Sequence, residues 1–348
     1  MRIINAIRAQ NVGGVDQVFR NYTQVLLESG HKVGLLISEN KNCEYDFLEV
    51  KEIFKLKNKS QIGDFFNLLK IVILFKPDII ICHSNRLMSW MKFLRFFNKI
   101  GLTKAKSVAV NHGISFSKSL NCDYIININK EINDLVVKAG FNSNKSFILP
   151  NVIDVNLPFI KKSVKNAPVI GIYGRIEHRK GFDLLIKASG ILAQRNYDFR
   201  LKIGGFEVPG NYNLQTLKNI ADKNNILEKC DFVGVVKNKP NFFKDVDIFC
   251  VPSREEPFGL VILEGFLHST LVISSNTDGG KLLIENGEDG LLFNNEDEKD
   301  LAAKIELVLK SLEVYEKITK KAFEKLENKY SLKNLKKEMS EILQVIAR

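Results

Sequence analysis

The sequence predicts an α/β protein built from two Rossmann-like, doubly wound domains that face each other across a cleft. Short apolar runs rich in Ile and Val alternate with longer helix-like stretches along the 348 residues. This alternation is typical of parallel sheets with crossover helices. The pattern restarts after a connecting segment, 149–168, that carries three prolines. Ligands of such sheets bind where the strands end, so the loops that follow strands are the candidate sites.

The first domain is expected to span residues 1–155 and the second residues 168–329. Strands of the first are predicted at 2–7, 32–37, 78–83, 106–111 and 123–127, with helices near 15–29, 62–75 and 130–139. Strands of the second are predicted at 169–174, 199–205, 230–236, 247–253 and 271–276, with helices near 182–193, 213–224, 258–268 and 298–311. The tail is amphipathic, and we expect its last helix, about 330–348, to pack back on the first domain.

The composition is that of an ordinary globular protein, with 45% hydrophobic and 26% charged residues. The most apolar stretch, 71–82, is interrupted by Lys76 and Pro77, and it is shorter than the roughly 20 residues of a membrane-spanning helix. The start of the chain is too short and polar for a signal peptide, so a cytoplasmic location is expected. The five cysteines, at 43, 82, 122, 230 and 250, form no metal-binding or disulfide pattern and are expected to be reduced.

The net charge of +11 leaves three kinds of partner open: a nucleic acid, an anionic membrane surface and a phosphate-bearing substrate. Biased codon usage explains a diffuse excess of lysine equally well. Only clustered charge therefore indicates a site.

Two loops of the predicted first domain follow strand ends. Gly13 and Gly14 precede a helix, where glycine lets the backbone approach an anion bound at the helix N-terminus, although a tight turn alone needs the same residues. His112 and His83 each stand at the end of a strand. A lone histidine is commonly structural, and the neighbouring glycine favours His112 over His83 as a ligand-binding residue.

Two loops of the predicted second domain carry charged side chains. Arg175 and Lys180 lie between a strand and a helix, where two cations can clamp a diphosphate through charge-assisted hydrogen bonds. The stretch REEPFGLVILEG places Glu256 before a predicted helix and Glu264 along it. Two carboxylates at this spacing can form an acid–base pair or can hold the two ends of an extended ligand.

Together these motifs resemble the retaining glycosyltransferases of family 4, which have the GT-B fold. The resemblance rests on GGV after the first strand, NHG, LPNVID before the linker, GRIEHRKG, FVG, EPFGLVILEG and ENGEDGLLF, in this order over nearly the whole chain. It implies transfer of a hexose from a UDP- or GDP-linked sugar to an envelope glycan or glycolipid such as lipopolysaccharide. It implies neither a metal nor another cofactor.

The resemblance also implies roles for the candidate residues. Glu256 would bind hydroxyls of the donor sugar and Glu264 the ribose hydroxyls, while Arg175 and Lys180 would bind the diphosphate and stabilise its charge as the glycosidic bond breaks. His112 would reach the sugar from the first domain. The other implied donor-binding residues are Gly13, Gly14, Phe258, Gly259, Leu260 and, near the base, Val235.

For the reaction, the resemblance favours front-face attack with the leaving phosphate as base, over the carboxylate nucleophile used by retaining glycosidases. The DVD sequence at 245–247 mimics a metal-binding motif of another glycosyltransferase fold, but its two acids are predicted to end a helix and to start a strand. Two departures from the family pattern stand out. The glutamate common after the paired glycines of NTDGGK is missing, and Val152 replaces a common glycine. The first departure loosens any assignment of the donor sugar.

Residues 86–106 combine the only Trp, several Phe and six Lys or Arg with no acid. On a helix, Trp90, Phe93, Leu94 and Phe97 would share one face, as in an interfacial membrane helix. A buried crossover helix with snorkelling lysines would show the same pattern. The expectation is a peripheral position on the inner face of the plasma membrane.

Three other functions are considered. A nucleotide-sugar epimerase or a sugar-phosphate-forming enzyme with a soluble acceptor would share the fold, but the basic aromatic stretch argues against it. A nucleic-acid-binding protein would need recognisable binding motifs, which the sequence lacks. A dinucleotide oxidoreductase would need G-x-G-x-x-G and an acid near residue 30, which are also missing.

Overall fold

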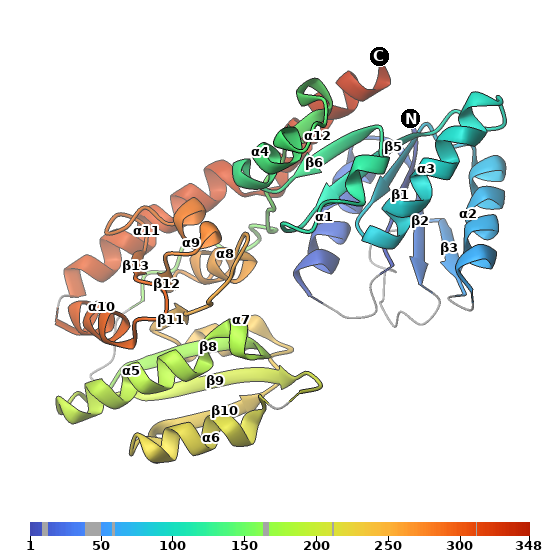
Figure 1. Ribbon diagram of the computed structural model, residues 1–348. Coiled ribbons are helices and arrows are strands. Elements are labelled where there is room, and N and C mark those ends of the chain that lie inside the picture. Colours follow the sequence, from blue (N-terminus) through green and yellow to red (C-terminus); the bar gives the residue numbers. More distant parts are fainter. Residues whose placement is uncertain (9–12, 39–49, 58–59, 163–166, 211, 311) are drawn as a thin grey trace. The chain divides into compact units, whose positions relative to one another are not determined.

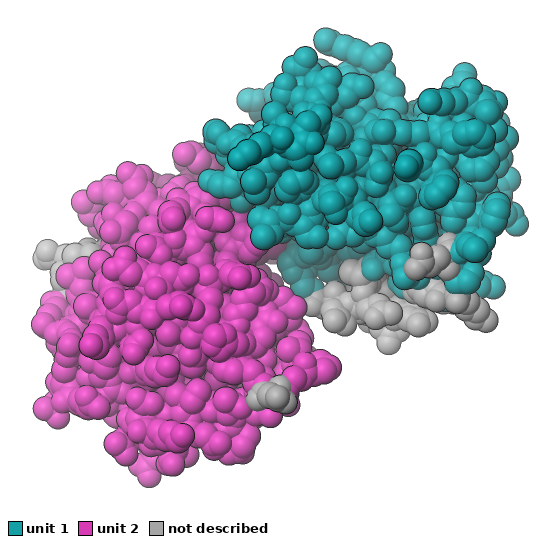
Figure 2. Space-filling model, in the orientation of Figure 1, with its two compact units in different colours: residues 1–154, 330–348 teal, residues 155–329 magenta. Residues whose placement is uncertain are grey.

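The computed structural model describes residues 1–8, 13–38, 50–57, 60–162, 167–210, 212–310 and 312–348. The chain divides into two units, coloured separately in Figure 2. Unit 1 contains Met1–Asp154 and Tyr330–Arg348, and unit 2 contains Val155–Lys329. Each unit is built on one parallel sheet with helices packed on it (Figure 1). The predicted class, two doubly wound α/β domains, is confirmed.

The sheet of unit 1 has the strand order β3-β2-β1-β4-β5-β6-β7, and the neighbouring strands are parallel. Its order reverses between β1 and β4, which is where ligands of such sheets bind. The strands are β1 (Arg2–Ala6), β2 (Lys32–Ser38), β3 (Glu52–Leu56), β4 (Ile79–Cys82), β5 (Lys106–Asn111), β6 (Tyr124–Asn127) and β7 (Ser146–Ile148). The helices are α1 (Gly14–Glu28), α2 (Gln61–Phe75), α3 (Asn85–Lys99), α4 (Lys130–Lys138) and α12 (Leu332–Ala347).

The sheet of unit 2 repeats this arrangement with the order β10-β9-β8-β11-β12-β13. Its reversal lies between β8 and β11. The strands are β8 (Val169–Ile176), β9 (Arg200–Glu207), β10 (Cys230–Gly234), β11 (Ile248–Val251), β12 (Leu271–Ser275) and β13 (Leu291–Phe293). The helices are α5 (Phe182–Gln194), α6 (Leu214–Lys223), α7 (Lys239–Asp245), α8 (Leu260–Leu267), α9 (Asp278–Leu283), α10 (Glu298–Lys310) and α11 (Leu312–Lys329).

Central strands are easy to recognise in the sequence because they are buried on both faces. All four residues of β4 and of β11 are buried, so each strand is a continuous apolar run rather than an alternating one. In the edge strand β3, partly buried and exposed residues alternate up to Leu56, which is buried. The sequence prediction missed β3, β7, β13 and α9, which are short elements whose apolar pattern is weak. The helix expected to end at Asp245 is α7.

Helix ends follow local rules. The Ser60 hydroxyl accepts a hydrogen bond from the Gly63 amide at 2.9 Å and caps the start of α2. This helix ends at Phe75, and its C-cap residue Lys76, whose φ is +49°, stands directly before Pro77. Proline cannot continue a helix, so the chain turns there into β4.

The C-terminal helix α12 packs within unit 1. The Ile153 amide donates to the Tyr330 carbonyl at 3.1 Å where the chain returns to this unit. Lys336 Nζ donates to the Glu28 carbonyl of α1 at 3.0 Å, and the Ile346 side chain is fully buried. Contacts of α12 with the first helix thus close the hydrophobic core of unit 1.

The prediction that Trp90, Phe93, Leu94 and Phe97 form one exposed membrane face of the segment 86–106 is wrong. Trp90 and Leu94 are buried, and Phe97 is only partly exposed. The helix α3 connects β4 to β5, so its apolar stripe packs inward as a crossover helix requires. Phe93, from the expected set, is 58% exposed, and Phe96, outside it, is 59% exposed.

The cysteines that the structure describes, at 82, 122, 230 and 250, are free thiols. Three of these are buried, and Cys43 lies outside the described residues. Within the described part of the chain, no helix is long and apolar enough to cross a membrane.

Candidate functional site

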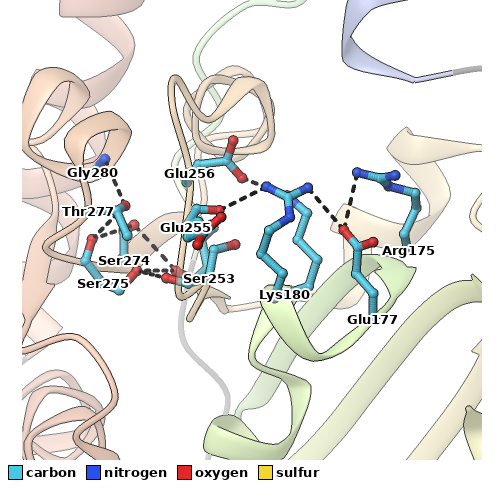
Figure 3. Close-up of polar contacts among 12 residues, drawn as sticks. Arg175, Glu177, Lys180, Ser253, Glu255, Glu256, Ser274, Ser275, Thr277 and Gly280 are labelled. Carbon is cyan, nitrogen blue, oxygen red and sulfur yellow. Dashed lines mark hydrogen bonds and ion pairs between the residues drawn. The ribbon is translucent and has the colours of Figure 1, made fainter. Parts of the chain in front are cut away.

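Two loops of unit 2 meet at the point where the strand order reverses (Figure 3). One follows β8 and contains the short helix His178–Lys180, and the other, residues 252–259, follows β11. Lys180 Nζ lies 2.6 Å from Glu256 Oε2, and both side chains are less than one-fifth exposed. Two of the residues predicted from the sequence are therefore in direct contact.

The two loops can approach because residue 181 has no side chain. Gly181 has φ +68°, a left-handed conformation, and a Cβ there would lie 1.8 Å from the Pro252 carbonyl oxygen. Any other residue would force the two backbones apart. The glycine that follows Lys180 therefore sets the distance from Lys180 to Glu256.

The other side of the 252–259 loop rests on α9. The Gly279 amide donates to the Glu256 carbonyl at 2.7 Å, and a Cβ at Gly279 would lie 2.4 Å from the Phe258 carbonyl oxygen. Ser275 Oγ donates to the Ser253 carbonyl at 2.5 Å (Figure 3). The first of the paired glycines in NTDGGK is thus needed because backbone packs directly against it.

A buried ion pair joins the same two loops. Arg254 donates two parallel hydrogen bonds to Asp183, at 2.9 and 2.8 Å, and a third to the His178 carbonyl at 2.6 Å. Burial opposes ionisation of Asp183, but the hydrogen bonds from Arg254 outweigh it, and the pKa of Asp183 lies below its ordinary value. Arg254 was not predicted as a site residue, although it stands two residues before Glu256.

Arg175 does not take part in the Lys180–Glu256 pair. Its Nη2 atom is 3.2 Å from Glu177 Oε1, and about half of its side chain is exposed. Arg179 contacts the same carboxylate at 3.0 Å and donates to the Glu255 carbonyl at 3.1 Å. Glu177 therefore orients both arginines, and Arg175 keeps an accessible guanidinium.

Glu264 lies on α8 and is almost completely buried. Its Oε1 atom is 2.5 Å from Lys239 Nζ, while Oε2 is buried with no hydrogen-bond partner among the described residues. Burial disfavours both charges, so it raises the pKa of Glu264 to about 8 and lowers that of Lys239. A buried acceptor without a donor costs free energy that a ligand hydroxyl can recover. No sequence pattern pointed to Lys239.

The helix α8 begins at Leu260, later than the predicted 258. Gly259 is its N-cap residue with φ +94°, and no side chain caps the helix. Phe258, just before it, is buried. The amides of the first turn are thus left without a capping side chain, as an anion-binding helix start requires.

The remaining candidates of unit 2 lie apart from these contacts. Val235 follows β10 and is exposed, next to Gly234 with φ +67°. Asp245 contacts Lys202 at 3.1 Å, and Asp247 accepts a hydrogen bond from the Val169 amide at 2.8 Å. Both acids of the DVD sequence therefore have partners within the unit.

The candidates of unit 1 also follow strands. Gly13 is the N-cap of α1 in extended conformation, Gly14 is the first helical residue, and a Cβ at Gly13 would meet no atom of the described residues within 4 Å. The preceding part of this loop, 9–12, lies outside the described residues. His112 Nε2 lies 3.1 Å from His83 Nδ1. Burial lowers the pKa of His112 to about 4, so its imidazole is neutral at neutral pH.

We expect Gly181→Ala to destabilise the protein by about 3 kcal/mol or more, because left-handed strain and overlap with Pro252 add. The matched control is Gly287→Ala, also left-handed with φ +85° but with no atom within 4 Å of the added Cβ. It should cost only about 1–2 kcal/mol. Chemical unfolding of both variants measures the difference. Equal losses would show that the close contact with Pro252 is unimportant.

The chain is similar in sequence to known glycosyltransferases. Residues 156–325 match the family described as Glycosyl transferases group 1. An uncharacterized glycosyltransferase of Haemophilus influenzae is 22% identical over 339 residues, covering 90% of this chain and 91% of that protein. The lipopolysaccharide core biosynthesis glycosyltransferase LpsE of Rhizobium meliloti is 28% identical over 166 residues, covering 48% of this chain and 46% of LpsE.

The fold is also that of a known glycosyltransferase class. The structure of Anabaena Alr3699/HepE in complex with UDP and glucose superimposes with a TM-score of 0.84 at 19% identity, covering 99% of both chains. A Rickettsia africae glycosyltransferase gives a TM-score of 0.83 at 20% identity and covers all of this chain. The chain therefore has the GT-B fold, and its residues 156–325 are similar to Glycosyl transferases group 1.

Proposed function

We propose that this protein is a retaining glycosyltransferase that moves a hexose from a nucleotide-diphosphate sugar to an envelope glycan or glycolipid. The observation that carries the proposal is the contact of Lys180 with Glu256 at the strand reversal of unit 2, beside the uncapped start of α8. The match of this unit to Glycosyl transferases group 1 supports it. The similarity to LpsE favours lipopolysaccharide or a related glycan as acceptor.

In this proposal the donor exchanges partners with the Lys180–Glu256 pair. Lys180 turns its ammonium to the diphosphate, and Glu256 accepts hydrogen bonds from hydroxyls of the sugar. Arg175, whose guanidinium is half exposed, adds a second cation. The first-turn amides of α8 face the same anion. These fixed positive groups stabilise the negative charge that develops on the leaving diphosphate.

Glu264 is assigned to the ribose of the nucleotide. Its unpartnered Oε2 forms a hydrogen bond with a ribose hydroxyl, while Lys239 holds Oε1. Glu264 lies five residues beyond Gly259, which is roughly 7 Å along a helix. One extended ligand can therefore contact the helix start with its diphosphate and Glu264 with its ribose.

We further propose front-face attack for the chemical step. Neither carboxylate is assigned as a nucleophile, because Glu256 is assigned to hydroxyls of the donor sugar and Glu264 to the ribose. The bond from the anomeric carbon to the diphosphate oxygen breaks, and the acceptor hydroxyl oxygen bonds to the same face. Its proton passes to the departing diphosphate. Arg175 and Lys180 supply the positive charge that a divalent ion supplies elsewhere.

The first test is donor binding followed by product analysis. UDP- and GDP-hexoses should raise the melting temperature, and a hundredfold excess over the dissociation constant adds about 2.7 kcal/mol of stability. Inorganic pyrophosphate is the control for binding of any anion. With the donor so found and extracted envelope glycan as acceptor, the new linkage should keep the donor's anomeric configuration, with turnover unaffected by EDTA. An inverted linkage would refute retention, and loss of turnover in EDTA would refute metal independence.

The two glutamates should have separable effects. Glu256→Gln should lower kcat about hundredfold or more, because it weakens contacts at the reacting sugar. Glu264→Gln should mainly weaken nucleotide affinity, about tenfold, or about 1.4 kcal/mol. Glu255→Gln, at an exposed neighbouring position, is the control. If both variants lowered only kcat, the pair would instead be an acid–base pair.

We also propose that unit 1 binds an anionic membrane surface through a patch on α2 and α3. Phe66, Phe93 and Phe96 are each more than half exposed. The Phe65 ring contacts the rings of both Phe66 and Phe93, with centroids 5.9 and 5.7 Å apart, so the two helices form one aromatic surface. The helices α2 and α3 also carry the exposed basic residues Lys70, Arg86, Lys92 and Lys99, and the acid of α2, Asp64, is buried. Apolar and basic groups together suit an anionic bilayer.

Vesicle binding tests this patch. The chain should bind vesicles that contain anionic lipid, and added salt should weaken binding because it screens the basic groups. Replacing Phe93 and Phe96 by Ser should reduce binding. The controls are Leu307→Ser, at an exposed apolar position of unit 2, and Trp90→Phe, at a buried position of α3. Unchanged binding by the double variant would exclude this surface.

A further inference from the structure

Three adjacent strands of unit 1 end in side chains that form one hydrogen-bonded chain. Asn5 lies on β1, His83 directly follows β4, and His112 directly follows β5. His83 Nε2 lies 2.9 Å from Asn5 Oδ1, and His83 Nδ1 lies 3.1 Å from His112 Nε2. Both ring nitrogens of His83 are therefore engaged, one with each neighbouring strand.

The orientation of the Asn5 amide is set by acceptors on α1. Asn5 Nδ2 donates to the Phe19 carbonyl at 3.0 Å and to Thr23 Oγ1 at 2.9 Å. The Thr23 hydroxyl uses its own proton on the Phe19 carbonyl, at 2.8 Å. A carbonyl only accepts, so the amide nitrogen must face α1 and the amide oxygen must face His83.

This orientation decides where the protons of His83 lie. Because Asn5 Oδ1 can only accept, His83 Nε2 must carry a hydrogen. The His83 ring is buried, with the rings of Phe19 and Tyr22 edge-on to it at 5.6 and 5.1 Å. A neutral imidazole carries one ring hydrogen, so with Nε2 protonated the Nδ1 atom of His83 keeps its lone pair and accepts from the next group.

We infer that Asn5 and His83 are positioning residues that hold His112 as the tautomer protonated on Nε2, with the lone pair of Nδ1 available. The opposite tautomer would place two lone pairs against each other across the 3.1 Å contact between the histidines. If the proposed function holds, Nδ1 of His112 then accepts a hydrogen bond from a sugar hydroxyl. The hydrogen bonds from Asn5 through His83 to His112 therefore favour a ligand group that donates to Nδ1 of His112, such as a hydroxyl, over a group that only accepts.

The tautomer can be measured without any substrate. The chain has five histidines, so ring nitrogen signals of a ¹⁵N-histidine-labelled sample can be assigned by comparison with His112→Gln and His83→Phe. At pH 7, His112 should be neutral, with an Nε2–H proton that exchanges slowly with water. That proton signal should disappear in His83→Phe. It should be retained in His83→Asn, whose amide oxygen can replace Nδ1 as the acceptor.

A double-mutant cycle tests the consequence for turnover. His83→Phe should lower kcat/KM about tenfold, and His83→Asn should restore most of it. In a His112→Ala background, His83→Phe should cause no further loss, because a positioning residue acts only through the residue it holds.

Two results would overturn the inference. One is a wild-type His112 that carries its proton on Nδ1 or is doubly protonated at pH 7. The other is a loss from His83→Phe that is equally large with and without His112, since this would indicate a purely structural role. If the protein transfers no sugar, the ring nitrogen signals alone decide the tautomer, so the two proposals fail separately.

Discussion

The candidate site of unit 2 depends on one close backbone contact, between Gly181 and the Pro252 carbonyl. It brings the loop after β8 against the loop after β11 and leaves no room for a side chain between them. The Arg254–Asp183 pair then fixes the same two loops in a buried environment. Breaking such a pair costs about 3–5 kcal/mol, because the remaining charge is left buried without a partner.

The sheets of the two units have a similar strand order, but different side chains follow the strands at the reversal point. In each, the strands that flank the reversal point are the first and fourth in chain order, β1 and β4 in unit 1 and β8 and β11 in unit 2. Unit 2 places charged side chains there, and a diphosphate requires such charge. Unit 1 has the hydrogen-bonded side chains of Asn5, His83 and His112 there, and such polar groups suit the hydroxyls of an uncharged sugar.

The helix α3 shows why an amphipathic pattern alone does not assign a surface. Trp90, Leu94 and their neighbours form an apolar stripe on a basic helix, and such a stripe fits a bilayer as well as a protein core. The sheet decides between them, because a crossover between two buried strands must pack against it. The aromatic residues left exposed are Phe93 and Phe96, together with Phe66 of α2.

Much of the fold and of the candidate site followed from the sequence itself. Buried parallel strands are continuous apolar runs, so β1, β4, β8 and β11 were recognisable, and with them the loops that carry Lys180, Glu256 and His112. The similarity of the motifs to glycosyltransferases added roles for these residues. All of this information is local, because it lies within a strand and the loop that follows it.

Only the tertiary structure decided which side chains are partners. Lys239 and Glu264 are 25 residues apart, His83 and His112 are 29 apart, and Asp183 and Arg254 are 71 apart. Each contact exists because two strands or helices far apart in the chain become neighbours. Hydrophobic periodicity describes the face of one element and carries no information on its neighbour. The composition and spacing of the site were therefore set by the sequence, and its hydrogen bonds and pKa values by the fold.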